Sequence, residues 1–403
     1  MNRIKIGCML LLVMCSVGAY PQDFCFTNSN VPDFLQTIPK SRYVPARSND
    51  TYIVRIFFHI IRRSNGTGGQ TPQEVDAAFN ILQSDYQPYG ICFFLVGVDE
   101  IRDDNTYNND NPAFFVPNKN GDGKFDNFAP NAHSDAIDIY LFANDKLSGG
   151  LLGPSAAGIP ASALVIGGNQ YNTNLVTSHV LPHEVGHCLG LYHTFHGMCG
   201  EGGCSELVDG SNCSVCGDFV CDTPAAPQTF HVDEHTCEWD GTTCNGFNTD
   251  ANGDAYNPNN SLIMAYIPPT CMPQYHTPGQ AARMKAVMDN SSILQNVVSL
   301  NAATYSNKTI ITNTTVTSCG GLNVEGVTVA LLSGKLMVEA AGDVNVKNTN
   351  VVIGAELAIE AAGDVNVENT NVTTGAKLTL DAAGTTTLGA GFEMQPGAEL
   401  EIK

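Results

Sequence analysis

Three closely spaced histidines near the middle of the chain form the pattern best suited to hold a metal ion. The segment reads His183-Glu-Val-Gly-His-Cys-Leu-Gly-Leu-Tyr-His193. His183 and His187 are four residues apart, so on a helix both imidazoles lie on one face, about one turn apart. Gly190 allows a sharp turn out of that helix, which would bring His193 back as a third ligand. We therefore predict a Zn²⁺ site made by His183, His187 and His193.

Glu184 follows the first of these histidines and is the candidate general base. Three neutral imidazoles leave the charge of Zn²⁺ uncompensated, which strongly acidifies a bound water. Glu184 would take a proton from this zinc-activated water as it attacks a carbonyl, and would then deliver the proton to the leaving amine. The predicted reaction is hydrolysis of peptide bonds, and the predicted partner is a protein or peptide substrate. The alternative, a helix with unliganded surface histidines, would need the whole extended pattern to arise by chance.

A second motif, Ser261-Leu-Ile-Met-Ala-Tyr266, contains a methionine followed two residues later by a tyrosine. We expect Met264 to pack beneath the imidazoles as a Met-turn without binding the metal. We expect Tyr266 to reach the zinc or the developing oxyanion with its hydroxyl, which makes it a second catalytic candidate.

Taken together, these motifs resemble those of the pappalysin (cytophagalysin) family of metzincin zinc endopeptidases. The likeness includes His193-Thr-Phe195, Gly217-Asp-Phe-Val-Cys-Asp-Thr-Pro224 and Thr277-Pro-Gly-Gln280, and it covers roughly residues 51–298. It implies a zinc endopeptidase in which a twisted sheet and the motif helix form the upper subdomain and an irregular region forms the lower one. The same resemblance implies a structural Ca²⁺ held by Asp218, by Thr223 and by the carbonyl of Cys221.

The resemblance also implies two disulfide bonds. One joins Cys237 to Cys271, and the other joins Cys244 to one of the cysteines between residues 199 and 216. The sequence holds more cysteines in that stretch than the family pattern requires, so the partner of Cys244 stays open. Cys188, inside the histidine motif, is expected to be a buried free thiol.

The elements that must position these residues alternate between strands and helices. Apolar, β-rich runs predict strands at 52–61, 91–98, 137–142 and 161–166. Capping-box patterns at Thr71 and Thr277 predict helices over 71–83 and 277–288. Pro182 is expected to kink or weaken the motif helix near 178–181. The expected fold is an α+β metzincin-type protease domain over residues 51–300.

Residues 301–403 form a separate, all-β repeat. The segment 335–355 recurs as 356–376 and more loosely as 377–398, with a period of 21 residues in the first two copies. Apolar residues alternate within each copy, which predicts three short strands per copy and one coil of a parallel β-solenoid. Stacked copies would place Asn345 on Asn366, Asn348 on Asn369 and Asn350 on Asn371. An antiparallel sandwich is the alternative, and a protease ending near Val298 is expected to fold without this tail.

The N-terminus indicates export. Arg3 and Lys5 precede an apolar run from Cys8 to Gly18, which is typical of a secretory signal peptide over residues 1–19 and too short to span a membrane. We expect a secreted or extracellular protein with no membrane insertion. The net charge of −21 would repel phosphate backbones, which argues against nucleic acid as a partner. An oxidising compartment favours disulfides among the cysteines.

Residues 20–50 form an N-terminal segment or pro-segment that contains Cys25. The Cys25 thiolate could occupy the open zinc position and keep the enzyme latent. Alternatively, Cys25 could form a disulfide with Cys92. A different class of function is a non-enzymatic adhesion or scaffold protein that attaches to surfaces through the repeats, but an intact Glu184 argues against an inert site.

Overall fold

The computed structural model describes most of the chain after residue 49. The described residues are 26–27, 50–109, 115, 121–147, 155–170, 172–198, 203–227, 232–243, 246, 248–330 and 333–403. The predicted signal peptide, Cys25, Cys199 and Cys244 lie outside these residues.

The protease part is built on a mixed sheet of seven strands in the order β1-β5-β6-β4-β2-β3, with β9 antiparallel beside β2. The strands are β1 Phe26–Thr27, β2 Tyr52–Arg62, β3 Ile91–Arg102, β4 Ile137–Leu141, β5 Ser155–Ala157, β6 Ala163–Ile166 and β9 Val298–Leu300. A small hairpin of β7 (Asn169–Gln170) and β8 (Thr173–Asn174) follows the sheet. The strands predicted from the apolar runs are all present.

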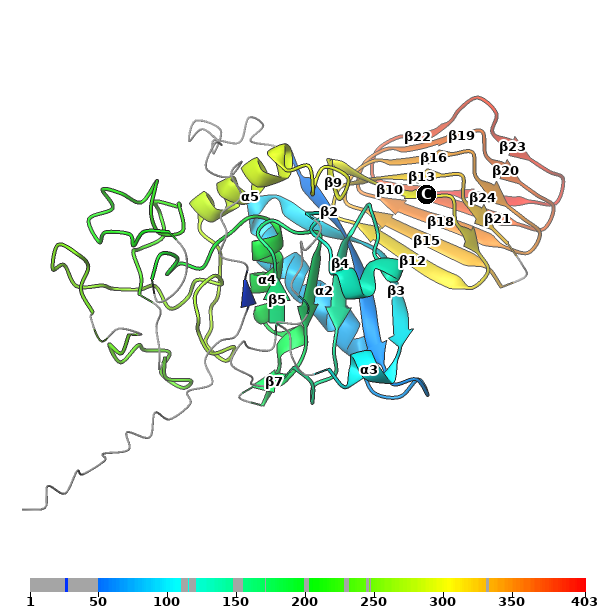
Figure 1. Cartoon of the computed structure of the whole chain (residues 1–403). Helices are drawn as coiled ribbons and strands as arrows, with labels where there is room; N and C mark the ends of the chain where they lie inside the picture. The colour runs from blue at the N-terminus through cyan, green and yellow to red at the C-terminus, as the bar shows by residue number, and fades with distance from the viewer. Residues whose placement is uncertain are drawn as a thin grey trace, which may run out of the picture.

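Three longer helices accompany this sheet: α2 Pro72–Tyr86, α4 Val180–Cys188 and α5 Pro278–Asn290. Shorter turns are α3 Asp104–Tyr107, η2 Gln87–Tyr89, η4 Asp126–Asn131 and η5 Leu175–Thr177. Thr71 and Thr277 form the capping boxes that the sequence predicts. Apolar residues of β2, β4, α2, α4 and α5 share one buried core, so the helices and the sheet are one packed unit (Figure 1).

Pro182 does not disturb the motif helix. The helix α4 begins at Val180, so Pro182 lies in its first turn. Backbone N–H groups in the first turn have no partner inside a helix, and proline therefore costs little there. The predicted kink is wrong, and the chain before the helix is instead the 3₁₀ turn η5.

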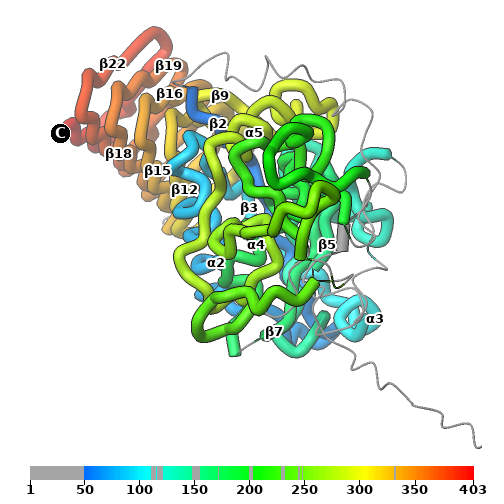
Figure 2. Tube along the Cα trace, turned by 90° about the vertical axis from the view of Figure 1, so that its left-hand side faces the viewer, coloured from blue at the N-terminus to red at the C-terminus, as the bar shows by residue number. Residues whose placement is uncertain are grey.

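The tail is a parallel β-solenoid. Each of its three sheets contains five strands, one from each successive coil, and every neighbouring pair is parallel (Figure 2). The first sheet contains β10 Ala302–Ser306, β13 Gly321–Glu325, β16 Val344–Lys347, β19 Val365–Glu368 and β22 Thr386–Leu388. The second contains β11 Thr309–Ile310, β14 Thr328–Val329, β17 Asn350–Val351, β20 Asn371–Val372 and β23 Glu393–Met394. The third contains β12 Asn313–Ser318, β15 Lys335–Ala340, β18 Glu356–Ala361, β21 Lys377–Ala382 and β24 Glu399–Ile402. The antiparallel sandwich is therefore wrong.

The coils align in the register that the repeat predicts. Asn345 lies opposite Asn366, and the amide of Asn366 donates to the side-chain oxygen of Asn345 at 3.2 Å. Asn350 lies opposite Asn371. Ile353 departs from the expected alternation, because the third strand of its coil ends at Val351 and the Ile353 side chain is 61% exposed.

The first coil is joined to the protease part by a shared core and a disulfide bond. Ile53 of β2 and Phe94 of β3 are buried among solenoid residues rather than in the protease core. Cys92 of β3 is bonded to Cys319, which follows β12. A Cys25–Cys92 disulfide, one of the sequence-based alternatives, is therefore excluded, and Cys92 links the two parts instead.

The stretch between α4 and α5 contains no regular helix among its described residues and is held by disulfides. The bonds are Cys204–Cys216, Cys213–Cys221 and Cys237–Cys271. Cys188 is a buried free cysteine, as expected. Within the described ranges, no helix has both the length and the apolar character that crossing a membrane requires.

Candidate metal centre and active site

The three histidines of the motif converge on one point. The Nε2 atom of His187 lies 3.1 Å from Nε2 of His183 and 3.1 Å from Nε2 of His193. All three residues are buried, with at most 5% of their surface exposed. The helix α4 supplies His183 and His187, and the turn after it supplies His193.

Their hydrogen bonds fix which nitrogen faces the centre. The Nδ1 atom of His183 lies 2.6 Å from the carbonyl oxygen of Ile263, and Nδ1 of His187 lies 2.8 Å from that of Leu191. A carbonyl only accepts, so each Nδ1 carries the proton and each Nε2 presents a lone pair. Lone pairs at such short separation repel one another unless a cation lies between them. The donor set of three imidazole nitrogens therefore fits Zn²⁺.

Glu184 is held beside this centre by a residue that the sequence did not point to. Its side chain is fully buried, and its Oε1 accepts a hydrogen bond of 2.7 Å from the hydroxyl of Ser155. Ser155 begins β5, the strand that pairs with β1 and β6. No spacing rule connects residues 155 and 184, so only the fold could reveal this contact.

Met264 lies directly beneath α4. It is fully buried, and a Cβ atom built on Gly186 would meet its sulfur at 2.6 Å. The helix therefore needs glycine between its two histidines so that the methionine can approach. The carbonyl of Ile263, the neighbour of Met264, accepts from His183, so this turn also orients a candidate ligand.

Tyr266 stands against the histidines. Its ring centroid lies 4.8 Å from that of His193 and 6.2 Å from that of His183. Together with His183, Ile267 and Gln274, it lines a small cavity next to the centre.

The turn that returns His193 depends on a close contact with α5. Gly190 has φ +97°, and a Cβ atom there would meet Val287 at 2.6 Å. The buried Arg283 donates from Nε to the Gly190 carbonyl at 2.9 Å, and its guanidinium lies 5.2 Å from the ring centre of Tyr192. No sequence pattern indicates this role of Arg283, because its partner Gly190 lies 93 positions away in the chain.

Two buried carboxylates, those of Asp218 and Glu206, form a second candidate cation site. The Oδ1 atom of Asp218 accepts from the backbone of Val220 at 3.0 Å and lies 3.0 Å from the Thr223 hydroxyl. The other oxygen, Oδ2, is buried and has no hydrogen-bond partner among the described residues, and the same holds for Oε2 of Glu206. Burial raises the pKa of Asp218 to about 7. Burial and the nearby Asp218 charge raise the pKa of Glu206 to about 8.

The family resemblance of the sequence predicts Asp218, Thr223 and the carbonyl of Cys221 as ligands at this site. It does not predict Glu206. Two buried carboxylates with unused oxygens fit a hard divalent cation such as Ca²⁺. The sulfur of Cys221 is bonded to Cys213, and a ligand role for its carbonyl stays a prediction.

The chain is similar in sequence to a known protein family and to several extracellular metalloproteases. Residues 161–289 match the family model described as Pregnancy-associated plasma protein-A. An extracellular metalloprotease of Arthroderma otae is 30% identical over 250 residues, which covers 58% of this chain and 75% of that protein. One from Podospora anserina is 30% identical over 189 residues, covering 43% of this chain and 55% of that protein. One from Pyricularia oryzae is 28% identical over 254 residues, which covers 59% of this chain and 74% of that protein.

The chain thus spans little more than half the length of the Podospora relative. The matched segment contains the three histidines, Glu184, Met264 and Tyr266. The family model and the relatives agree with the resemblance of the motifs, and the chain belongs to the pappalysin family of metalloproteases.

Proposed function

We propose that the chain is a secreted zinc endopeptidase that cleaves peptide bonds in proteins, with His183, His187 and His193 as the zinc ligands. The observation that carries this proposal is the convergence of three Nε2 atoms, together with the carbonyl oxygens that face Nδ1 of His183 and Nδ1 of His187. The names of the relatives, all extracellular metalloproteases, support secretion. Bound at this centre, Zn²⁺ would supply Lewis acidity toward the scissile carbonyl and the attacking water.

Glu184 serves as the general base in this proposal. It takes the proton of the attacking water and returns it to the leaving amine. Ser155 keeps one oxygen of this carboxylate in place by a hydrogen bond of 2.7 Å. Tyr266 stands beside the histidines at the edge of the small cavity, where its hydroxyl can stabilise the oxyanion.

Replacement of the base tests this assignment. Glu184→Gln preserves the size of the side chain and should lower peptide turnover by at least about 10²- to 10⁴-fold. Zinc content, measured by mass spectrometry, should be unchanged. Tyr266→Phe should cost roughly 10- to 1000-fold, as the loss of one oxyanion donor does. A Glu184→Gln protein that retains wild-type turnover would show that the base has been misassigned.

We also propose that a structural Ca²⁺ is bound at Asp218 and Glu206, with Thr223 and the carbonyl of Cys221 nearby. The support is that both carboxylates have a buried oxygen without a hydrogen-bond partner in the described part of the chain. Such a cation would offset the cost of burying two carboxylates near each other.

Finally, we propose that the segment before residue 50 keeps the enzyme latent through Cys25. The support is the parallel pairing of Phe26 with Ala156 on β5, the strand that carries Ser155. Cys25 itself lies outside the described residues. A Cys25→Ser protein should be active as soon as it is secreted, whereas the wild type should gain activity as the segment is removed. Equal activity of both proteins before any processing would rule the switch out.

A further inference from the structure

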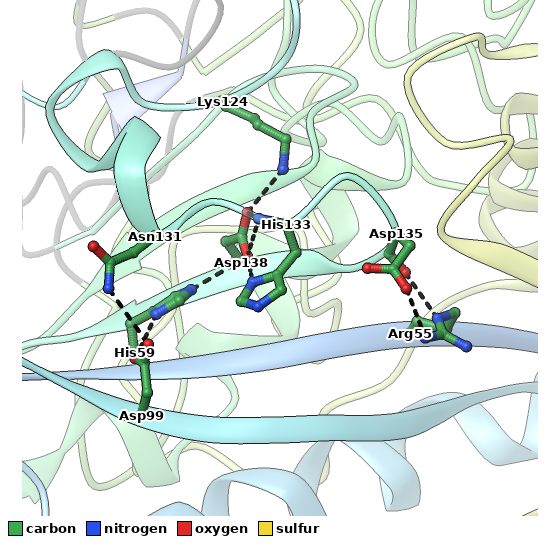
Figure 3. A network of polar contacts seen from close by, with 8 residues as sticks. All are labelled: Arg55, His59, Asp99, Lys124, Asn131, His133, Asp135 and Asp138. Atoms are coloured by element: carbon green, nitrogen blue, oxygen red, sulfur yellow. Dashed lines mark hydrogen bonds and ion pairs between the residues drawn. The ribbon is translucent and has the colours of Figure 1, made fainter. Parts of the chain in front are cut away.

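A second cluster of potential metal ligands lies on the sheet, away from the three catalytic histidines. It contains His59 of β2, Asp138 of β4 and His133 from the loop before β4. Figure 3 shows the two imidazoles and the Asp138 carboxylate turned toward one another, with Lys124 and Asp99 at the edges. Phe58 and Ile60, the neighbours of His59, belong to the core beneath the helices. Since side chains alternate along a strand, His59 faces the opposite side of the sheet.

His59 is oriented as a metal ligand would be. Its ring is fully buried, and its Nδ1 lies 2.7 Å from Oδ1 of Asp99, its direct neighbour on β3. A histidine that donates one ring N–H to a carboxylate presents the lone pair of its other nitrogen, which is the usual arrangement around a metal. Here that other nitrogen, Nε2, points at Oδ1 of Asp138, at a distance of 3.2 Å.

The distances agree with a shared cation. Ligands bound to Zn²⁺ at 2.0–2.1 Å in a tetrahedron are separated by about 3.3 Å. The separation of 3.2 Å between His59 Nε2 and Asp138 Oδ1 matches this value, and so do the 3.1 Å separations in the triad. The Nδ1 atom of His133 lies 2.7 Å from the same oxygen of Asp138, so this pair would have to open slightly, and all three ligand atoms lie within 4.8 Å of one another.

We propose that His59 Nε2, His133 Nδ1 and Asp138 Oδ1 bind a second Zn²⁺. Two imidazoles and one carboxylate suit a divalent transition metal, and the ring of His133 is 29% exposed, so solvent can supply the fourth ligand. Lys124 keeps its contact with the other oxygen of Asp138, at 2.9 Å. This ion would join β2 and β4 to the loop that carries His133, and its role is structural.

The competing explanation is a network of ion pairs without metal. In that case His59 carries two protons and donates to both Asp99 and Asp138, while Lys124 completes the charge balance. The two explanations differ in how many zinc ions the folded chain holds, and this number can be measured without any activity assay.

The test uses the full chain, stripped of metal, reloaded with Zn²⁺ in the presence of calcium and passed through a desalting column. Mass spectrometry of the bound metal should find two zinc ions per wild-type chain. His133→Phe retains a ring to stack on Phe57, which lies 3.9 Å away, and should reduce the count to one. His187→Ala, which removes a catalytic ligand, should also leave one, and the double variant none.

Two further variants sharpen the result. Asp99→Asn leaves all three ligands and should weaken binding at the second site about 10- to 100-fold. Asp135→Asn removes a carboxylate on the same loop that pairs with Arg55 outside the cluster, and should leave two zinc ions. With Co²⁺ in place of zinc, the His187→Ala chain should show visible absorption that His133→Phe abolishes. One zinc ion in the wild type and an unchanged count in His133→Phe would overturn the proposal in favour of the ion-pair network.

Discussion

In the solenoid each residue meets its counterpart one coil away, whereas in the protease part the residues around the histidines come from elements far apart in the chain. Leu336 lies opposite Leu357, and Val338 opposite Ile359, 21 residues later in each case. Around the triad, by contrast, Met264 packs beneath Gly186, and Ser155 holds Glu184. A substitution within one coil should therefore affect only the neighbouring coils, whereas a substitution near the three histidines should disturb the active site.

The largest effect is expected from a truncation at the junction between the protease part and the solenoid. A chain ending at Leu300 would expose Ile53 and Phe94 and leave Cys92 without Cys319. Each buried side chain contributes about 1.5–3 kcal/mol, and a disulfide about 2–4 kcal/mol. The free energy of unfolding should therefore fall by several kcal/mol, with a large drop in melting temperature and loss of peptidase activity on warming.

A chain ending at Ala382 is the matched control for this truncation. It removes only β22, β23 and β24 at the far end of the solenoid, and it should retain wild-type activity and nearly the wild-type melting temperature. If the chain ending at Leu300 has the same melting temperature as the full protein, the junction does not contribute to stability. The tail would then be removable, as the sequence alone suggests.

The same contrast explains what could be predicted from the sequence. The capping boxes at Thr71 and Thr277 depend on residues three positions apart, and both are present. The repeat specifies strand pairing because neighbouring coils have nearly the same sequence. The histidine motif occupies one helix and one turn, so its convergence could be predicted from spacing.

The features that were missed depend on long-range packing. Ser155 and Glu206 reach their sites from segments with no motif of their own, and Arg283 lies on a predicted helix whose motif does not indicate its contact with Gly190. The Cys92–Cys319 bond joins residues 227 positions apart, and no local pattern selects one such pair among many cysteines. The prediction of a kink at Pro182 was wrong because it assumed an earlier start of the helix. The 3₁₀ turn η5 precedes α4, so the helix begins only at Val180 and Pro182 lies in its first turn.

One glycine in each part allows a direct comparison. Gly186→Ala would place a Cβ atom 2.6 Å from the Met264 sulfur and push the turn whose carbonyl orients His183. Turnover should fall on the order of 10- to 100-fold, since small misplacements near a reacting centre are that costly. Gly375→Ala meets no atom closer than 3.7 Å, but its φ of +74° should cost about 1–2 kcal/mol.

Both variants should be assayed for turnover and for melting temperature. Gly375→Ala should lower only the melting temperature, because Gly375 lies between β20 and β21 of the solenoid and the added Cβ atom would approach only Ile353. Equal losses of turnover in the two variants would contradict the idea that damage to a coil stays local.

The carboxylates of the two parts should also respond differently to pH. In the solenoid, Glu356 and Glu368 are partly exposed and pair with Lys335 and Lys347. In the protease part, Glu206 is buried near Asp218, and without a cation their pKa values are raised to about 8 and about 7. The ordinary pKa values are 4.5 for Glu206 and 3.8 for Asp218. Between these ordinary values and the raised ones, the folded chain therefore binds more protons than the unfolded chain.

Stability then falls as the pH rises through this window, because proton release favours the unfolded state. We expect the melting temperature of the calcium-free, zinc-loaded chain to drop between about pH 5 and pH 8. Calcium binds the ionised pair and should therefore raise the melting temperature much more at pH 8 than at pH 5. Glu206→Gln should remove most of this gain, whereas Glu356→Gln should leave it intact. A calcium effect of the same size at both pH values, or one that survives in Glu206→Gln, would place the cation elsewhere.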